Sequence, residues 1–383
     1  MLKILHLINS LNRGGIEMWL LSMLRQIPRN QYQMDFCCKG QNVGALANIA
    51  EELGAKVFHC QLNFAHFGFI NNLKRIIIEG NYQILHNHLE AYSGLGTWLG
   101  NELGIPVITS FHNTKFFTPQ TPLTRRFVIR QLRSIYAKFS IRYALENSHL
   151  VTGCSQGVID SLTGFDQNIK NSGVVLNYGV NIPDLATPEK WKELRNSFGW
   201  TEDTPIILHV GRLIEQKNHL GLLSIFQKVV EKIPTAKLLL VGEGPLRGLI
   251  TENITKLGLI NAVKLIGIRD DIPALMTCAN VFLFPSFHEG LPVVSLEANA
   301  AGLPIVGSKI PGLIEAVKDR ETAILHEVED LEGMAKSTID IINNRQYAQD
   351  LAQAGRAWIK SKYSTENSAK GLIKIYHNCL IKT

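Results

Sequence analysis

Short apolar runs rich in β-branched residues alternate with longer amphipathic segments along most of the chain. In the first half these runs are LKILHLI, QMDFCCK, AKVFHC, QILHNH, PVITSF and HLVTGC. The segments between them, such as EMWLLSMLRQI and VGALANIAEELG, have the length and apolar spacing of helices. Strands that alternate with helices form right-handed βαβ units, so the pattern predicts a parallel sheet covered by helices.

The alternation pauses where glycine, asparagine and proline cluster, in GVVLNYGVNIPDLATPEKWKELRNSFGW. A second series follows: PIILHVG, AKLLLVG, AVKLIGI, NVFLFPSF and PIVGS. A chain of 383 residues is long enough for two domains. We therefore predict an α/β protein with two tandem Rossmann-like, doubly wound parallel-sheet domains that face a cleft. The predicted domains are 1–180 and 181–362, with 363–383 as a terminal helix that packs back towards the first domain.

The composition is that of a soluble globular protein, with 45% hydrophobic and 19% charged residues. Apolar runs are shorter than the roughly 20 residues that span a bilayer, and the start MLKILHLINSLNRGG lacks a small-residue cleavage site. The six cysteines form no CxxC pair, which favours reduced thiols in a cytoplasm, and we expect no metal. His86 and His88 leave two interpretations open, a polar pair that lines a cleft or a pair of zinc ligands.

One stretch of the first half is basic and aromatic. Asp and Glu are absent from Leu103 to Leu145, where Lys and Arg lie among Phe and Tyr. Such a helix rests on anionic lipid headgroups or receives a phosphorylated acceptor, and Arg126, Arg130 and Arg133 are assigned to this patch. A solvated helix face is the alternative. No nucleic-acid-binding motif accompanies the charge, so nucleic acid is not expected as a partner.

Glu289 and Glu297 are the only formally charged residues between Asp271 and Lys309. Burying an isolated carboxylate costs several kcal/mol unless hydrogen-bond donors reach it, and a polyhydroxylated ligand supplies such donors. VFLFPSF reads as a buried strand, Pro292 is suited to open a helix and Gly302 to close it. Glu289 is then expected in the loop at the carboxyl end of the strand and Glu297 on the helix. The alternative is two ordinary surface glutamates.

Other strand-end loops carry residues suited to an anion. The first strand leads through Gly14 and Gly15 into a helix, where backbone N–H groups can approach a phosphate. The pattern is not GxGxxG, which disfavours NAD. Arg212 and Lys217 in HVGRLIEQKN are expected to converge on one anionic group, as a diphosphate requires.

Three further loops complete the candidate set. Gly242 in VGEGPLR permits close backbone approach, and the backbone at Ile268 and Arg269 is expected where a nucleotide base is read. His112 lies just beyond a strand, where it either hydrogen-bonds a sugar or an acceptor hydroxyl or is a core histidine with a backbone partner.

Taken together, GGIE, GRLIEQKN, VGEGP and HEGLPVVSLE resemble the retaining, nucleotide-sugar-dependent glycosyltransferases of the GT-B fold, known as glycosyltransferase family 4 or group 1. The resemblance covers essentially the whole chain, and its strongest element is the E-x7-E spacing of Glu289 and Glu297. The opening LINSLNRGGIEMWLL is similar to transferases of bacterial exopolysaccharide and capsule biosynthesis.

The resemblance implies a role for each matching residue. Glu297 would bind the ribose, Arg212 and Lys217 the departing diphosphate, and Gly15 would allow its approach. The donor sugar would be held by Glu289 with the backbone of Gly290 and Leu291, and His112 would lie near its outer hydroxyls and the acceptor.

The family works without a metal, and this chain lacks a DxD motif. No cofactor is implied, because a UDP- or GDP-sugar is the donor substrate. The family reaction is a same-face displacement in which the leaving phosphate accepts the proton of the incoming hydroxyl.

The expected function is the transfer of a hexose-type sugar to a carbohydrate or lipid-linked carbohydrate acceptor. The expected location is the cytoplasm, as a peripheral protein at the inner face of the cell membrane. Two alternatives are a nucleotide-sugar epimerase on the same scaffold and a noncatalytic nucleotide-sugar sensor.

Overall fold

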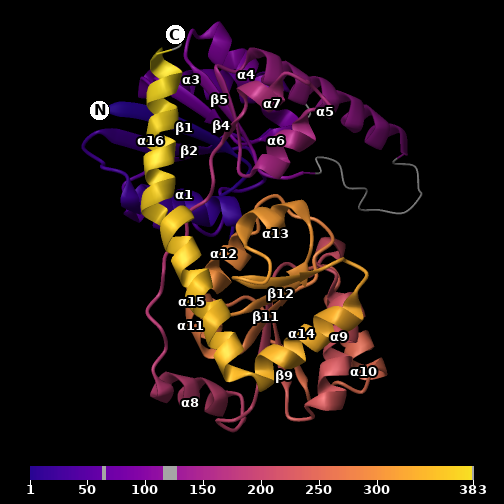
Figure 1. Cartoon of the computed structure of the whole chain (residues 1–383). Helices are drawn as coiled ribbons and strands as arrows, with labels where there is room; N and C mark the ends of the chain where they lie inside the picture. The colour runs from indigo at the N-terminus through magenta and orange to yellow at the C-terminus, as the bar shows by residue number, and fades with distance from the viewer. Residues whose placement is uncertain (63–65, 115–126, 382–383) are drawn as a thin grey trace. The chain divides into compact units, whose positions relative to one another are not determined.

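The computed structural model describes residues 1–62, 66–114 and 127–381. The chain forms two compact units, one of Met1–Gly179 with Thr365–Thr383 and one of Val180–Ser364. The first unit therefore contains both ends of the chain (Figure 1). The divisions lie at 179/180 and 364/365, against the predicted 180/181 and 362/363.

Within the described ranges, the first unit is a parallel sheet of seven strands in the order β3-β2-β1-β4-β5-β6-β7. The strands are β1 Leu2–Ile8, β2 Tyr32–Cys38, β3 Val57–His59, β4 Ile84–Asn87, β5 Val107–Phe111, β6 Leu150–Gly153 and β7 Val174–Val175. Its helices are α1 Gly15–Gln26, α2 Ala47–Glu52, α3 His66–Gly80, η1 Glu90–Tyr92, α4 Ser93–Glu102, α5 Phe127–Asn147, α6 Gln156–Leu162, α7 Ile169–Ser172 and α16 Thr365–Ile381.

The second unit is a parallel sheet of six strands, counted over the same described residues, in the order β10-β9-β8-β11-β12-β13. The strands are β8 Ile206–Val210, β9 Lys237–Val241, β10 Val263–Leu265, β11 Val281–Phe284, β12 Ile305–Ser308 and β13 Ala323–His326. Its helices are α8 Pro188–Ser197, η2 Glu215–Lys217, α9 His219–Lys232, α10 Arg247–Lys256, α11 Ile272–Cys278, α12 Val293–Ala300, α13 Pro311–Ala316, α14 Leu331–Asn343 and α15 Arg345–Lys362.

Both strand orders confirm the predicted class of two doubly wound α/β domains. In each sheet the order reverses at one place, between β1 and β4 in the first unit and between β8 and β11 in the second. Open α/β sheets bind ligands outside the carboxyl ends of the strands at this reversal. The sequence interpretation did not include β7 or β13.

The two faces of the first sheet differ in polarity. Leu5 and Leu7 belong to a buried apolar cluster that includes Phe69 and Leu73 of α3. Side chains alternate between faces along a strand, so His6 leaves the sheet on the opposite face. Ring contacts between His6 and Tyr376 place α16 over that face, beside β1 in Figure 1.

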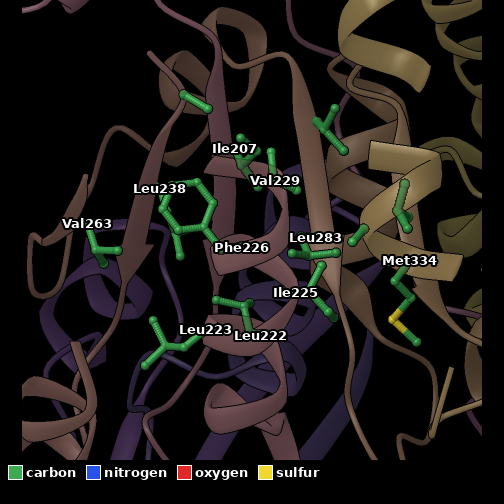
Figure 2. Close-up of a cluster of buried hydrophobic side chains, with 14 of the residues drawn as sticks. Ile207, Leu222, Leu223, Ile225, Phe226, Val229, Leu238, Val263, Leu283 and Met334 are labelled. Carbon is green, nitrogen blue, oxygen red and sulfur yellow. The ribbon is translucent and has the colours of Figure 1, made fainter. Parts of the chain in front are cut away.

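The core of the second unit is built around α9. Ile225, Phe226 and Val229 of this helix meet Leu238 and other strand residues in a fully buried apolar cluster (Figure 2). Met334 of α14 closes the same cluster. This core fixes the sheet whose loops are described below.

Asn218 is placed to hold the start of α9. It is the N-cap, with φ 52°, and its side chain accepts a hydrogen bond from the Gly221 N–H at 3.1 Å. Asn218→Ala is expected to destabilise the protein by about 1–2 kcal/mol, because it removes the cap and puts a Cβ-bearing residue without a local hydrogen bond in the left-handed region. Asn218→Gly is the matched control, with a smaller loss, because glycine tolerates this φ. Denaturant unfolding of the full chain measures both, and equal losses would contradict the account.

Over the residues that the structure describes, no helix has both the length and the apolarity needed to cross a bilayer. All six cysteines are buried, and none of them forms a disulfide.

Candidate active site

The loops after β8, β9 and β10 are joined by backbone hydrogen bonds. The Gly211 N–H donates to the Val241 carbonyl at 2.9 Å, and the Leu213 N–H donates to the Glu243 carbonyl at 3.0 Å. The Gly242 N–H donates to the Gly267 carbonyl at 2.8 Å. These bonds make the carboxyl edge of half the sheet one connected surface.

Gly242 is required by this arrangement. Its φ is 134°, and a Cβ on it would lie 2.0 Å from the Gly211 carbonyl oxygen. The close approach that the sequence predicted for Gly242 is therefore taken by the neighbouring loop, and its contact with a donor stays a prediction.

Lys217 and Glu289 form an ion pair across the point where the strand order reverses. The Lys217 Nζ lies 2.7 Å from the Glu289 Oε1, with the two side chains 14% and 10% exposed. The lysine stem passes over Gly211, where a Cβ would be 3.3 Å from the Lys217 Cδ and Cε. Nζ also lies 4.9 Å from the centre of the Phe284 ring. Glu289 therefore has a cationic partner that its sequence neighbourhood does not contain.

A glutamine ties together the same two loops. The Gln216 Nε2 donates to the His288 carbonyl at 2.8 Å, and the Phe287 N–H donates to the Gln216 carbonyl at 2.9 Å. These bonds hold the loop that contains Lys217 against the loop that contains Glu289. The sequence interpretation missed Gln216, although it lies beside Lys217 in GRLIEQKN.

Glu297 lies on α12, one turn beyond its start. Pro292 is the N-cap of this helix and Gly302, with φ 71°, follows its end, so the predicted helix is confirmed. The carboxylate is partly buried and makes no hydrogen bond or ion pair within the described part of the chain. Burial raises the pKa of Glu297 to about 7. A carboxyl of this kind accepts hydrogen bonds from a ligand when it is ionised.

Gly290 and Leu291 are buried in the loop between β11 and α12. The loop meets the start of α13, because a Cβ on Gly312 would lie 2.1 Å from the Gly290 carbonyl oxygen and 2.8 Å from that of Glu289. Glycine at 312 is therefore needed to hold the backbone around Glu289 in place.

Arg212, Ile268 and Arg269 are exposed at the same edge. The Arg212 side chain has no hydrogen bond or ion pair to the residues that the structure describes, whereas Lys217 is paired with Glu289. The two cations therefore share no protein partner, and their convergence on one anion stays a prediction. Arg269 pairs with Asp271 through two contacts, Nε to Oδ1 at 2.8 Å and Nη2 to Oδ2 at 2.7 Å. The side chain of Arg269 is thus held by Asp271, and contact of its backbone with a base stays a prediction.

In the first unit, Gly15 is the first residue of α1 and is exposed. Glu17 lies in the first turn of this helix, and its carboxylate occupies the space above Gly14, where a Cβ would be 2.4 Å from Oε2. An acidic group therefore shares the helix end that the sequence assigned to a phosphate.

His112 follows β5, and both of its ring nitrogens have protein partners. Nε2 lies 3.0 Å from the His88 Nδ1, and Nδ1 is hydrogen-bonded to the Tyr178 hydroxyl. Its backbone N–H donates to the Glu90 Oε1 at 2.9 Å. Burial lowers the pKa of His112 to about 3, so the ring is neutral. His112 is therefore a buried residue at the end of the strand. The partners of its ring are the side chains of His88 and Tyr178, where the sequence interpretation named a backbone partner as one alternative.

The basic patch is described in part. Arg126 lies outside the described residues, and Arg130 lies on α5. Arg133 is exposed on the same helix. Ile135 and Phe139, 50% and 71% exposed, lie one turn apart on a different face of it.

Among the described residues, one group has the makings of a metal site. The ring nitrogens of His6, His86 and His88 lie within 4.8 Å of one another, and all three are buried. Their nitrogens are engaged in hydrogen bonds within the protein, among them the contact of 3.0 Å between the His6 Nδ1 and the His88 Nε2. His86 and His88 are both buried, so the structure does not show them lining a cleft, and the choice between a polar pair and zinc ligands stays a prediction. His6 was missed, although LKILHLI shows it as a polar break in an apolar strand.

Comparison with known proteins places both units. Residues 13–180 match the family described as Glycosyltransferase Family 4, and residues 191–358 match Glycosyl transferases group 1. The putative glycosyltransferase EpsF of Bacillus subtilis (strain 168) is 29% identical over 323 residues, 82% of this chain and 81% of that protein. The UDP-Gal:alpha-D-GlcNAc-diphosphoundecaprenol alpha-1,3-galactosyltransferase of Escherichia coli is 24% identical over 344 residues, 87% of this chain and 86% of that protein.

The fold has solved counterparts. The crystal structure of Anabaena HepE in complex with UDP-glucose superposes with a TM-score of 0.83 at 20% identity, over 98% of this chain and 100% of that chain. These relatives named as transferases do not favour the epimerase or the noncatalytic sensor. Because the two family matches together span both units, the chain belongs to the group 1 and family 4 glycosyltransferases and has the GT-B fold.

Proposed function

We propose that this glycosyltransferase moves a sugar, with retention of anomeric configuration, from a UDP- or GDP-sugar to a carbohydrate or lipid-linked carbohydrate acceptor in surface glycan biosynthesis. The observation that carries the proposal is the pairing of Lys217 with Glu289 at the strand-order reversal of the second unit, 2.7 Å apart. Glu297 adds a carboxylate on the helix after the same loop.

The three groups suit different parts of a nucleotide sugar. Lys217 uses one of its N–H donors on Glu289, and the remaining two serve the phosphate oxygens on which charge grows as the diphosphate leaves. Glu289, held by the lysine, accepts hydrogen bonds from sugar hydroxyls. Glu297, which has no described protein partner, accepts them from the ribose, and Arg212 adds an exposed cation for the diphosphate.

Retention without a covalent intermediate is part of the proposal. Glu289 is ion-paired, which makes it a positioning group for the donor sugar and a poor candidate for a nucleophile. The leaving phosphate accepts the proton of the incoming hydroxyl, and lysine and arginine take the charge-neutralising role that a divalent metal has elsewhere. The absence of a DxD sequence supports this.

The choice of donor class is supported by the relatives. The Escherichia coli relative is named for UDP-Gal, and the HepE structure contains UDP-glucose. A thermal-shift screen of nucleotides and nucleotide sugars tests the choice, because a ligand that binds the folded state raises the melting temperature by mass action. Purified protein is then incubated with the best donor and lipid-linked acceptors from cells, with and without EDTA. We expect release of UDP or GDP that EDTA does not change. NMR of the product is expected to show the same anomeric configuration as in the donor sugar. The proposal would be refuted if no nucleotide or nucleotide sugar bound and no donor released its nucleotide.

An anionic membrane surface is the proposed setting, on the cytoplasmic side, with the protein peripheral to it. Arg133 places a cation on one face of α5, and exposed Ile135 and Phe139 place apolar groups on another face of the same helix. Arg130→Glu combined with Arg133→Glu is expected to lower the affinity for anionic vesicles, measured by sedimentation, by about 30-fold or more, since each basic residue near such a surface contributes about 1 kcal/mol. Lys228→Glu, on the other unit, is the matched control and should leave sedimentation unchanged. Unchanged sedimentation of the double variant would remove the membrane role.

A further inference from the structure

Three buried imidazoles and two tyrosine hydroxyls form one continuous chain of hydrogen bonds in the first unit. The Tyr376 hydroxyl lies 3.1 Å from the His6 Nε2, and the His6 Nδ1 lies 3.0 Å from the His88 Nε2. The His88 Nδ1 lies 3.0 Å from the His112 Nε2, and the His112 Nδ1 meets the Tyr178 hydroxyl. The chain therefore runs from α16, through the ends of β1, β4 and β5, to Tyr178.

Strand register brings these groups together. His6 of β1 is paired with His86 of β4, and His88 comes two residues later, on the same face because side chains alternate. The rings of His88 and His112 stack with centres 5.2 Å apart. Tyr178 lies with its ring 5.0 Å from that of Trp19, which donates to the Ser368 hydroxyl of α16 at 2.8 Å. At the other end of the hydrogen-bond chain, the Tyr376 ring lies 6.5 Å from that of Tyr32, so an aromatic residue packs against each end.

Each nitrogen of the three rings is used once, and this has a chemical consequence. A neutral imidazole has one N–H and one bare nitrogen, so each ring must donate one bond and accept the other. All the bonds then point the same way along the chain. A single ring of the opposite tautomer would place two N–H groups or two lone pairs face to face, so the three rings must change tautomer together.

The rings are neutral in the folded protein. Burial lowers the pKa of His6 and of His112 to about 3, and burial first, with neighbouring histidines second, lowers that of His88. His86 forms a side branch, with Nδ1 3.4 Å from the Tyr376 hydroxyl and Nε2 2.7 Å from the Ser110 hydroxyl. This branch is compatible with either direction of the hydrogen bonds along the chain, because the Tyr376 hydroxyl can donate to one of His6 and His86 while it accepts from the other.

We propose that this chain of hydrogen bonds is a tautomer lock, a set of rings whose tautomers depend on one another, and that it positions His112. His6 and His88 are its positioning residues, and Tyr376 and Tyr178 are its two ends. The lock makes the hydrogen-bearing nitrogen of His112 depend on the tautomers of His88 and His6, and it holds the ring at the carboxyl end of β5. The role of the lock in catalysis rests on the proposed function, since it requires His112 to serve the donor sugar or the acceptor. The existence of the lock does not rest on the proposed function.

The first experiment reads the tautomers directly. The full chain is labelled with ring ¹⁵N histidine, and long-range ¹⁵N–¹H spectra are recorded with EDTA present. His6, His88 and His112 are each expected as one neutral tautomer that is constant between about pH 6 and about pH 8, where an exposed histidine titrates. Tyr376→Phe removes one end, so the tautomer signals of all three rings should change, His112 included, although two rings separate it from Tyr376. Tyr178→Phe, which removes the other end, replaces this variant if it does not fold.

Tyr32→Phe is the matched control. The Tyr32 hydroxyl also bonds a histidine of α16, the His377 Nε2 at 2.7 Å, but it lies off the chain. This variant should leave the His112 signals unchanged. A His112 spectrum that ignores Tyr376→Phe, or mixed tautomers in the unmodified protein, would overturn the lock. Joint shifts of His6, His86 and His88 on adding one equivalent of Zn²⁺ without EDTA would overturn it in favour of a metal site.

The second experiment asks whether the lock serves the reaction. With an active donor and acceptor pair, Tyr376→Phe and His88→Gln are expected to lower kcat by about tenfold or more, with little change in donor KM, because misplacement of an aligned group acts on the chemical step. Tyr32→Phe should keep the kcat of the unmodified protein. If the unmodified protein transfers no sugar, the proposed function fails while the spectra still test the lock. If the spectra change and kcat does not, the positioning role is refuted.

Discussion

Replacing Lys217 with alanine is expected to lower kcat by about 10²- to 10³-fold, with a smaller change in donor KM. The ammonium stabilises charge that grows on the diphosphate in the transition state, and removing one such preorganised donor costs this much in other enzymes. The side chain is held for that task by Glu289 at 2.7 Å and by the Phe284 ring at 4.9 Å. Steady-state kinetics of nucleotide release measure the effect.

Loss of stability has to be separated from loss of chemistry. Lys217→Ala leaves Glu289 buried without its cation, and breaking a buried pair costs about 3–5 kcal/mol, less where some exposure remains. A double variant, Lys217→Met with Glu289→Gln, removes both charges and should recover stability without recovering turnover. Lys228→Ala, on α9 and paired with exposed Glu332, is the surface control and should change neither quantity. Turnover restored in the neutral double variant would refute the role of Lys217 in catalysis.

Replacing Glu297 with glutamine is expected to make the protein more stable and a poorer binder of its donor. Burial raises the pKa of Glu297 to about 7 from 4.5, so the folded state holds a proton between these values that the unfolded state releases. The stability contributed by this group is therefore full below pH 4.5 and is lost as the pH rises through about 7. At about pH 8 the glutamine variant should gain up to about 3 kcal/mol, since one pKa unit is worth about 1.4 kcal/mol.

The cost of that substitution falls on the donor. An ionised carboxylate that accepts from ribose hydroxyls contributes about 1.5–3 kcal/mol, so the donor KM should rise by about 10- to 100-fold at about pH 8. In the unmodified protein the donor KM should fall as the pH rises through about 7, because the binding form is the ionised one, and the variant should lose this dependence. Glu252→Gln, an exposed pair with Lys256, is the control, with a stability change within about 0.5 kcal/mol. A lower kcat at unchanged donor KM would contradict the ribose role.

Much of the fold followed from local patterns. The apolar runs of the sequence correspond to β1 to β6 and β8 to β12, because a buried parallel strand needs a near-continuous apolar segment and a helix needs a different period. Pro292 and Gly302 marked the ends of α12 for a similar reason, since their backbone preferences act on their own neighbours. Strand β13, Ala323–His326, was not predicted because its apolar run AIL is short and lies among charged residues in DRETAILHEVED.

The site divides along the same line. Spacing alone put Glu289 in a loop and Glu297 on the helix behind it, but it left Glu289 without a cation. Lys217 lies 72 residues away in sequence and reaches it because β8 and β11 are neighbours in the sheet. In the loop after β9 a tertiary contact takes the space beside Gly242, where the Gly211 carbonyl lies, whereas the space above Gly14 is taken by Glu17 of the same helix end, which is a local contact.

The sequence by itself determined where strands and helices lie, that the chain forms two doubly wound domains, and which glutamates are unusual. These properties depend on residues within a few positions of one another. Only the tertiary structure decided the partners, above all the pairing of Lys217 with Glu289 and the line of His6, His88 and His112 between Tyr376 and Tyr178. The physical reason is that strand order and register place side chains of distant segments on one face, and burial there makes each polar atom depend on a partner that local sequence does not specify.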